Sequence, residues 1–435
     1  MKATIIALAA LLAFVAFGSP APAQSAGIKK IIITMRAKSS AESQSKILRA
    51  LSAQSVARIA SNGTSSNEFL ALVAEVPAEL LVKSAKNRVA RLTVKDVMNL
   101  VPGVSASDVL GIEEDFTTKW IEAAPSFQTT AFPSVESVLK SLPKLQFRRL
   151  PKPSAGSTRP EITWGVERVK APAAWDYTEG KGVRVAVVDT GVYSDHNDLK
   201  GKVDGGYDAF TKSEVRVAYQ DGNGHGTHVA GTIAAIRNGK GVAGVAPMAR
   251  LYSVRVLDNE GSGSISGIID GIIWCANNGI QVANMSLGSS QGSDALHQAL
   301  RYAKSRGVVI VAAAGNSGGP VGYPAAYPET IAVAASDPSD KVASFSSRGP
   351  EVDFIAPGVS VVSTAMDGGY ANFSGTSMAT PHMSGLAALA VSQGWVGLDG
   401  PDGVFQQLRK AAKRIAGVTV EEQGFGMIDA GKLVR

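Results

Sequence analysis

The sequence has a single cysteine, Cys275, in 435 residues. An intramolecular disulfide is therefore excluded, and stability must come from packing, with bound ions as a further source. Because Cys275 lies in the amphipathic stretch 267–276, we interpret it as a small buried residue rather than a reactive thiol. Aromatic residues make up only 6% of the chain, charged residues 18%, and the net charge is +6. Lys and Arg are scattered, so a nucleic-acid partner is not expected.

Long hydrophobic runs are also lacking, apart from one at the N-terminus. Met1 and Lys2 are followed by an apolar run over 3–17 and by small and proline residues up to Ala23. This pattern is typical of a secretory signal peptide over residues 1–23. An uncleaved membrane anchor is the alternative, but the run is short for a span. We expect a secreted protein, extracellular or periplasmic, with no stable membrane association after removal of the signal.

Residues 24–101 are expected to form a small α+β unit without obvious chemistry. Apolar runs and helical spacing predict, in order, strand 31–35, helix 41–60, strand 69–76, helix 78–86 and strand 89–94. This β-α-β-α-β order has ferredoxin-like character.

Residues 102–157 are rich in proline, serine and threonine. We interpret them as a linker with one short helix over 135–142. The basic stretch 147–152 is either an exposed site for proteolytic nicking or simply a solvated part of the linker.

From residue 158 to 435, strands and helices alternate. The predicted strands, several of them continuous Val, Ala and Ile runs, are 183–188, 251–257, 282–287, 308–313 and 330–335. The predicted helices are 225–236, 264–277, 294–305, 376–391 and 404–415. This alternation indicates an α/β domain with a doubly wound, mostly parallel sheet. Its functional site should lie at the carboxyl ends of the strands.

One serine stands where an apolar, Ala-rich helix is expected to begin. Ser377 follows Gly375 and Thr376 and precedes the run 378–391. Unpaired N–H groups and the helix dipole favour negative charge at such a position. A hydroxyl held there could attack a carbonyl, and the oxyanion could rest on the Ser377 N–H. The alternative is an ordinary helix N-cap.

Three more polar residues stand at ends of predicted elements. Asp189 follows strand 183–188, where the alternative role is a turn or helix cap. His225 lies among glycines at the start of a predicted helix. A metal pair of His225 and His228 is the alternative, but no H-E-x-x-H pattern exists, and we interpret His228 as structural. Asn316 follows strand 308–313, and its amide could donate to an oxyanion or simply occupy a turn.

Asp189, His225 and Ser377 occur in the order Asp, His, Ser. The segments 187–191, 225–231 and 375–382 resemble the three signature blocks of the subtilisin-like serine proteases. The resemblance extends from about residue 164 to the C-terminus. It implies that Ser377 is the nucleophile, His225 the general base and Asp189 its orienting carboxylate. Asn316 and the Ser377 N–H would form the oxyanion hole.

The same resemblance implies how protein and peptide substrates bind. Two edge segments would pair with a peptide as an added strand: Gly261, Ser262 and Gly263, and Ser286, Leu287 and Gly288. Gly315 and Gly322 would line the primary pocket, with Ser317 where some relatives carry an acid. We expect broad specificity with an apolar or aromatic preference at P1, the substrate residue before the cleaved bond.

A structural calcium site is also implied by the resemblance. Its ligands would be the side chains of Asp198 and Asn238 and the carbonyls of Ile236, Lys240 and Val242, all hard oxygen donors. Two features depart from the family pattern: the charge of Lys240, and Pro160 or Glu161 where relatives have Gln. Glu351 and Asp353 are either a second, weaker cation site or a solvated pair.

The first unit resembles, more loosely, the family's propeptide, an intramolecular chaperone and inhibitor. We therefore expect a monomeric, self-processing endopeptidase that removes residues 24 to about 155 in cis. A pseudo-protease that binds peptides, and a dedicated processing protease for one partner, are the alternatives.

Overall fold

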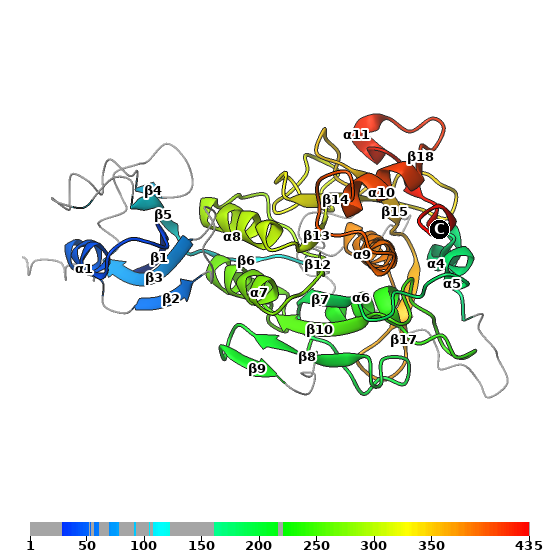
Figure 1. Ribbon diagram of the computed structural model, residues 1–435, viewed down its shortest axis with the longest axis horizontal. Helices are drawn as coiled ribbons and strands as arrows, with labels where there is room; N and C mark the ends of the chain where they lie inside the picture. Colours follow the sequence, from blue (N-terminus) through cyan, green and yellow to red (C-terminus); the bar gives the residue numbers. More distant parts are fainter. Residues whose placement is uncertain are drawn as a thin grey trace, which may run out of the picture.

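The computed structural model describes residues 28–51, 53, 56–60, 69–77, 91–92, 104, 108–121, 161–215 and 221–434. The predicted signal peptide, the helices predicted over 78–86 and 135–142, and the basic stretch 147–152 lie outside the described residues. Within the described part, none of the helices has the length and apolar character needed to cross a bilayer. Figure 1 shows a small unit packed beside a larger one.

The small unit is an antiparallel sheet in the order β2-β3-β1-β5-β4 with one described helix. Its elements are β1 (Ile28–Arg36), α1 (Ala41–Ala50), β2 (Val56–Ala60), β3 (Phe69–Pro77), β4 (Arg91–Leu92) and β5 (Val109–Glu114). Strand β1 is apolar on both faces because both are covered. Ile31 and Ile33 pack in one core with Ile47 of α1, whereas Ile32 belongs to the core of the larger unit.

Two predictions for this part of the chain are wrong. The helix predicted over 41–60 ends at Ala50, and residues 56–60 form β2 instead. Pairing of β2 with β3 in the sheet overrides the helical spacing of the apolar residues. The segment 102–157 also contains β5, which pairs with β1 and β4, so the sheet extends beyond residue 101.

The larger unit contains the predicted parallel sheet, in the order β15-β14-β13-β12-β7-β10-β8-β9. All five strands expected from the sequence are present: β7 (Arg184–Asp189), β10 (Arg250–Arg255), β12 (Val282–Met285), β13 (Val309–Ala313) and β14 (Thr330–Ser336). Three more were not expected: β8 (Val203–Asp208), β9 (Ser213–Val215) and β15 (Phe354–Pro357). Only β9 runs antiparallel to its neighbour.

Helices cover both faces of this sheet (Figure 1). On one side lie α6 (His225–Ala234) and α9 (Thr376–Ser392), and on the other α7 (Ile265–Asn277) and α8 (Asp294–Ser305). The doubly wound arrangement is confirmed, with α10 (Val404–Ala411) packed beside α9. The smaller elements are α4 (Trp164–Arg168), α5 (Ala171–Trp175), α11 (Val420–Gln423) and the two-stranded pairs β16–β17 (Val361–Thr364, Tyr370–Phe373) and β18–β19 (Ala412–Lys413, Met427–Ile428).

The order of the strands decides where the polar residues meet. Strands β7, β12 and β13 are neighbours and run in the same direction. Their carboxyl ends therefore lie at one edge of the sheet, as do the residues that follow them. The small unit lies on the other side of α7 and α8, with β1 and β5 against α8 and β2 against α7.

Candidate active site

The buried end of β7 places a carboxylate against an imidazole. Asp189 is fully buried, and its two oxygens lie 2.9 and 3.0 Å from Nδ1 of His225. The Thr190 N–H donates to the same carboxylate over 2.7 Å. His225 is the first residue of α6, and its ring is buried. These contacts fix both the orientation of the ring and the nitrogen that carries the proton toward Asp189.

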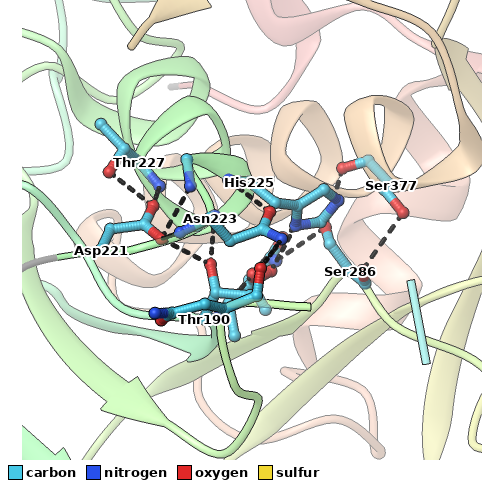
Figure 2. Close-up of polar contacts among 12 residues, drawn as sticks. Thr190, Asp221, Asn223, His225, Thr227, Ser286 and Ser377 are labelled. Atoms are coloured by element: carbon cyan, nitrogen blue, oxygen red, sulfur yellow. Dashed lines mark hydrogen bonds and ion pairs between the residues drawn. The ribbon is translucent and has the colours of Figure 1, made fainter. Parts of the chain in front are cut away.

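Ser377 lies near His225 in Figure 2, where its dashed hydrogen bonds run to Ser286 and not to the imidazole. The Ser377 hydroxyl donates to the carbonyl of Ser286 over 3.1 Å, and the Ser286 hydroxyl donates to the carbonyl of Ser377 over 2.8 Å. Nε2 of His225 is buried and has no hydrogen-bond partner among the described residues. The ring nitrogen that could take a proton is therefore not occupied by another described group.

Two N–H donors converge beside Gly375. The amide oxygen of Asn316 accepts from the N–H and the hydroxyl of Thr376 over 2.8 and 2.9 Å, which fixes the amide plane. A Cβ atom built on Gly375 would lie 3.5 Å from Asn316 Nδ2 and 3.6 Å from the Ser377 N. The two nitrogens therefore lie close to one another at the start of α9, where the sequence predicts the oxyanion hole.

The charge balance around His225 favours its protonated form. Burial alone would lower the pKa of His225, but the charge and hydrogen bond of Asp189 and the charge of Asp221 outweigh it, so the pKa is raised. His228, one turn further along α6, behaves differently. It is buried against Phe373 and its Nε2 lies 3.0 Å from the carbonyl of Val361. Burial lowers its pKa to about 3, as suits a neutral structural histidine.

The two predicted peptide-binding edges lie against a segment of this same chain. Strand β6 (Thr117–Lys119) pairs antiparallel with β11 (Ser262–Ser264). The N–H of Trp120 then donates to the Gly261 carbonyl over 3.0 Å, and the Gly288 N–H donates to the Trp120 carbonyl over 2.9 Å. Residues 117–120 therefore occupy the place where the sequence predicts a bound peptide strand.

The side chain of Trp120 anchors this segment. It is 2% exposed, and its indole N–H donates to the Gly263 carbonyl over 2.8 Å. The segment lies within the region predicted to be a linker, and its sequence contains no long apolar run that would have marked it as a strand. Only the pairing with β11 reveals its place.

The residues predicted for the primary pocket lie beside Asn316. The N–H of Gly322 donates to the Ala314 carbonyl over 2.9 Å, and a Cβ atom on Gly322 would lie 3.1 Å from the Ser289 carbonyl. Gly315 has a φ of 113°, which disfavours a side chain there. The Ser317 hydroxyl lies 3.2 Å from that of Ser347, so the groups that meet here are neutral.

The residues predicted to bind calcium lie close together: the loop over 236–242 packs against Asp198, whose carbonyl accepts from the Ile236 N–H. Asp198 is buried, and its carboxylate accepts from the Val242 N–H and the Tyr370 hydroxyl, each over 2.9 Å. Asn238 accepts through its side-chain oxygen from the Lys240 N–H over 3.0 Å. Glu161 adds a second carboxylate, which accepts from the N–H groups of Asn238 and Gly239.

The chemistry of this loop fits a hard cation. The carbonyl oxygens of Ile236, Lys240 and Val242 accept no hydrogen bond from any described residue. Carbonyl, amide and carboxylate oxygens together form the donor set that Ca²⁺ prefers. Clusters of three or more His, Cys, Asp or Glu side chains suited to a metal are absent from the described residues. A site here would therefore depend on main-chain and amide oxygens.

Glu351 and Asp353 line a cavity of about 330 Å³ away from His225 and Ser377. The Asp353 carboxylate accepts from the Ala332 N–H over 2.9 Å, and burial raises its pKa to about 7. Cys275, as expected, is a buried free cysteine, and burial raises the pKa of its thiol.

Comparison with known proteins identifies the family. The model of the Subtilase family matches residues 180–426, more than half of the chain. The chain belongs to the subtilase family. This subtilase is 48% identical over 284 residues to the alkaline elastase YaB of Bacillus sp. (strain YaB), which covers 64% of this chain and 72% of that protein.

Two further relatives of this subtilase show the same match. Subtilisin Savinase of Lederbergia lenta is 54% identical over 230 residues, covering 52% of this chain and 83% of its own. Thermitase of Thermoactinomyces vulgaris is 49% identical over 233 residues, a match that covers 53% of this chain and 82% of thermitase. The protein is therefore a hydrolase, a subtilisin-like serine endopeptidase. The small unit, residues 28–114, lies outside the matched residues of the family model.

Sequence reasoning missed one buried carboxylate at this site, Asp221. It stands four residues before His225 and accepts hydrogen bonds from the N–H groups of Gly224, just before His225, and Thr227, just after it (Figure 2). The signal was an aspartate just ahead of the glycine-rich start of a predicted helix, a typical place for a capping carboxylate.

Proposed function

We propose that this subtilase cleaves peptide bonds through Ser377, His225 and Asp189. Ser377 attacks the scissile carbonyl while Nε2 of His225 takes its proton, and His225 then passes that proton to the leaving amine. Asp189 holds the imidazole in the required tautomer and stabilises the imidazolium. The observation that carries the proposal is the pairing of Asp189 with Nδ1, which leaves Nε2 unoccupied by any other described group.

The oxyanion formed in this reaction is held by the Asn316 amide and the Ser377 N–H. Both donors are fixed before substrate arrives, because Thr376 holds the Asn316 amide and α9 holds the Ser377 N–H. Such preorganised donors stabilise the transition state without reorganisation during the reaction, and one is typically worth about 3–4 kcal/mol.

We further propose that the protein is made as a secreted, self-processing precursor. The small unit acts as a propeptide of ferredoxin-like character, an intramolecular chaperone and inhibitor. The strand pairing of β6 with β11 supports this role, because it fills the groove a substrate needs. The precursor then removes residues 24 to about 155 in cis.

Replacing the nucleophile tests this function. Ser377→Ala should accumulate as the unprocessed precursor and fail to react with an organophosphonate probe. The matched control is Ser374→Ala, because Ser374 is a neighbouring serine whose hydroxyl accepts from the Ser360 N–H. It should mature and react normally. Normal maturation of pure Ser377→Ala would contradict self-processing, whereas absent probe labelling of the unaltered protein would indicate a pseudo-protease.

Substrate selection follows from the groove. Main-chain pairing along β11 and Gly288 tolerates many sequences, so specificity is broad. The pocket beside Gly315 and Gly322, with the neutral Ser317, prefers apolar or aromatic residues at P1. Peptides that differ only at P1 would test this preference, and a higher kcat/KM for Lys or Arg than for Phe would overturn it.

We propose that the loop over 236–242 holds a structural Ca²⁺. The side chains of Asp198 and Asn238 and the carbonyls of Ile236, Lys240 and Val242 are its ligands, and Glu161 supplies additional negative charge beside them. A cation bound there neutralises these oxygens and restrains the loop that precedes β10, but takes no part in bond cleavage. The processed enzyme is expected to act as a monomer.

A further inference from the structure

A second buried carboxylate lies beside the catalytic histidine. Asp221 is 5% exposed and accepts five hydrogen bonds. One oxygen accepts from the Thr190 hydroxyl and from the N–H groups of Asn223 and Gly224 at 2.8–3.0 Å. The other accepts from the N–H and hydroxyl of Thr227 at 2.9 and 2.7 Å. Every one of these partners is within four residues of Asp189 or His225.

The bonds to Asp221 join the two elements that carry the charge pair. Thr190 directly follows Asp189, and its hydroxyl donates to Asp221 while accepting from the Gly226 N–H over 3.1 Å. Thr227 lies in the first turn of α6, two residues after His225. Asp221 thereby ties the carboxyl end of β7 to the first turn of α6 (Figure 2). A shift of either element would move His225 relative to Asp189.

Few other charges face the imidazole. Strand β7 contributes Asp189, and α6 contributes only the neutral His228. Helix α9 contributes the buried His382, whose pKa is lowered to about 4 by burial. Strand β10 ends in Arg255, which is paired with Asp208 at 3.3 Å. Strand β16 carries no charged residue. In the described part of the chain, Asp189 and Asp221 are therefore the two negative charges that act on His225.

We propose that Asp221 is a positioning residue for catalysis, which fixes His225 against Asp189 and supports its imidazolium with a second negative charge. The proposal deepens the function proposed above and rests on it. Asp221 touches neither substrate nor the reacting atoms. Its effect passes through the first turn of α6 and through the field at the imidazole. A group that only stabilised the fold would not change how His225 titrates.

The test compares Asp221→Asn with Asp337→Asn. Asp337 is a control of similar chemistry, because its carboxylate also accepts two backbone N–H groups in a turn, but on an exposed loop after β14. In a Ser377→Ala background, NMR of the ¹⁵N-labelled imidazoles follows His225 directly, since the chain has only five histidines. Asp221→Asn should lower the pKa of His225 by about half a unit to one unit, and Asp337→Asn should leave it unchanged. This NMR measurement does not depend on protease activity.

Kinetics of the active enzyme supply the second arm. The acidic limb of kcat/KM should shift to lower pH by the same amount in Asp221→Asn. Asp221→Glu keeps the negative charge but cannot keep all five hydrogen bonds. It should therefore leave the acidic limb of the kcat/KM profile at the same pH but lower kcat on the order of tenfold, with little change in KM. If Asp221→Asn does not fold, Asp221→Glu still decides the positioning role. A lower melting temperature with unchanged His225 titration and kcat would reduce Asp221 to a structural cap.

Discussion

One contact between the small unit and the larger one is made by a buried carboxylate, Glu113 of β5. It is 5% exposed and accepts from the Ser293 hydroxyl at 2.5 Å and from the N–H groups of Asp294 and Ala295 at 3.0 and 2.9 Å. These are the donors that the start of α8 cannot satisfy within the helix. Replacing Glu113 with Ala should therefore loosen the small unit from the larger one.

The structure sets the size of this effect. Leaving a buried donor without its partner costs about 1–3 kcal/mol, and Glu113→Ala removes the partner of three. Water will enter and satisfy part of the loss, so we expect a net cost of about 3 kcal/mol for docking. That free energy corresponds to an equilibrium constant for undocking that is on the order of 100-fold larger.

Hydrogen exchange measures this equilibrium in the uncleaved chain. In Ser377→Ala, the amides of Ile265 and Ser266, which donate to the Phe116 carbonyl and the Asp115 carboxylate across the contact, should exchange on the order of 100-fold faster once Glu113 is Ala. The matched control is Glu114→Ala, because the neighbouring Glu114 pairs with Lys29 at the surface. It should leave both amides unchanged. Equal exchange in the two variants would refute the idea that Glu113 holds the units together.

Three further results are expected. Asn316→Ala should lower kcat by about 10²–10³-fold with little change in KM, because one oxyanion donor is lost, whereas Ser317→Ala should change kcat little. Burial lowers the pKa of His228 to about 3 and of His382 to about 4, so stability present above pH 6.5 is lost as pH falls toward 4. Thermal melts of Ser377→Ala across this range measure it, and a flat profile would contradict it. Chelation of Ca²⁺ should lower the melting temperature of the parent protein but barely that of Asp198→Asn, and equal shifts would exclude the loop as the site.

Short-range patterns were sufficient to predict most of the larger unit. The parallel strands β12 and β13 are buried along their whole length, so their apolar runs were visible without any alternation. Strand β8 was missed because it holds two glycines where apolar residues would be expected. Gly206 is there because β10 passes so close that a Cβ atom would collide with the Ser253 carbonyl. The neighbouring backbone, and not the local sequence pattern, therefore determines which residue fits at such a position.

The small unit was harder to predict because its contacts join distant residues. Residues 56–60 had helical spacing, yet they became β2 because β3 offered an unpaired edge. Strand β6 has no pattern of its own and exists only through β11, more than 140 residues away. Local propensity is a weak guide where hydrogen bonds are supplied by another segment.

The amino-acid order alone determined the chemical types at the site: a hydroxyl at a helix start, an imidazole among glycines, a carboxylate and an amide after apolar strands. The folded chain decided what these groups do to one another. Only there does Asp221 lie beside His225, Asn316 Nδ2 beside the Ser377 N–H, and Trp120 in the groove. The reason is physical: hydrogen bonds and electrostatic fields depend on distances in space, and those distances are set by packing between segments far apart along the chain.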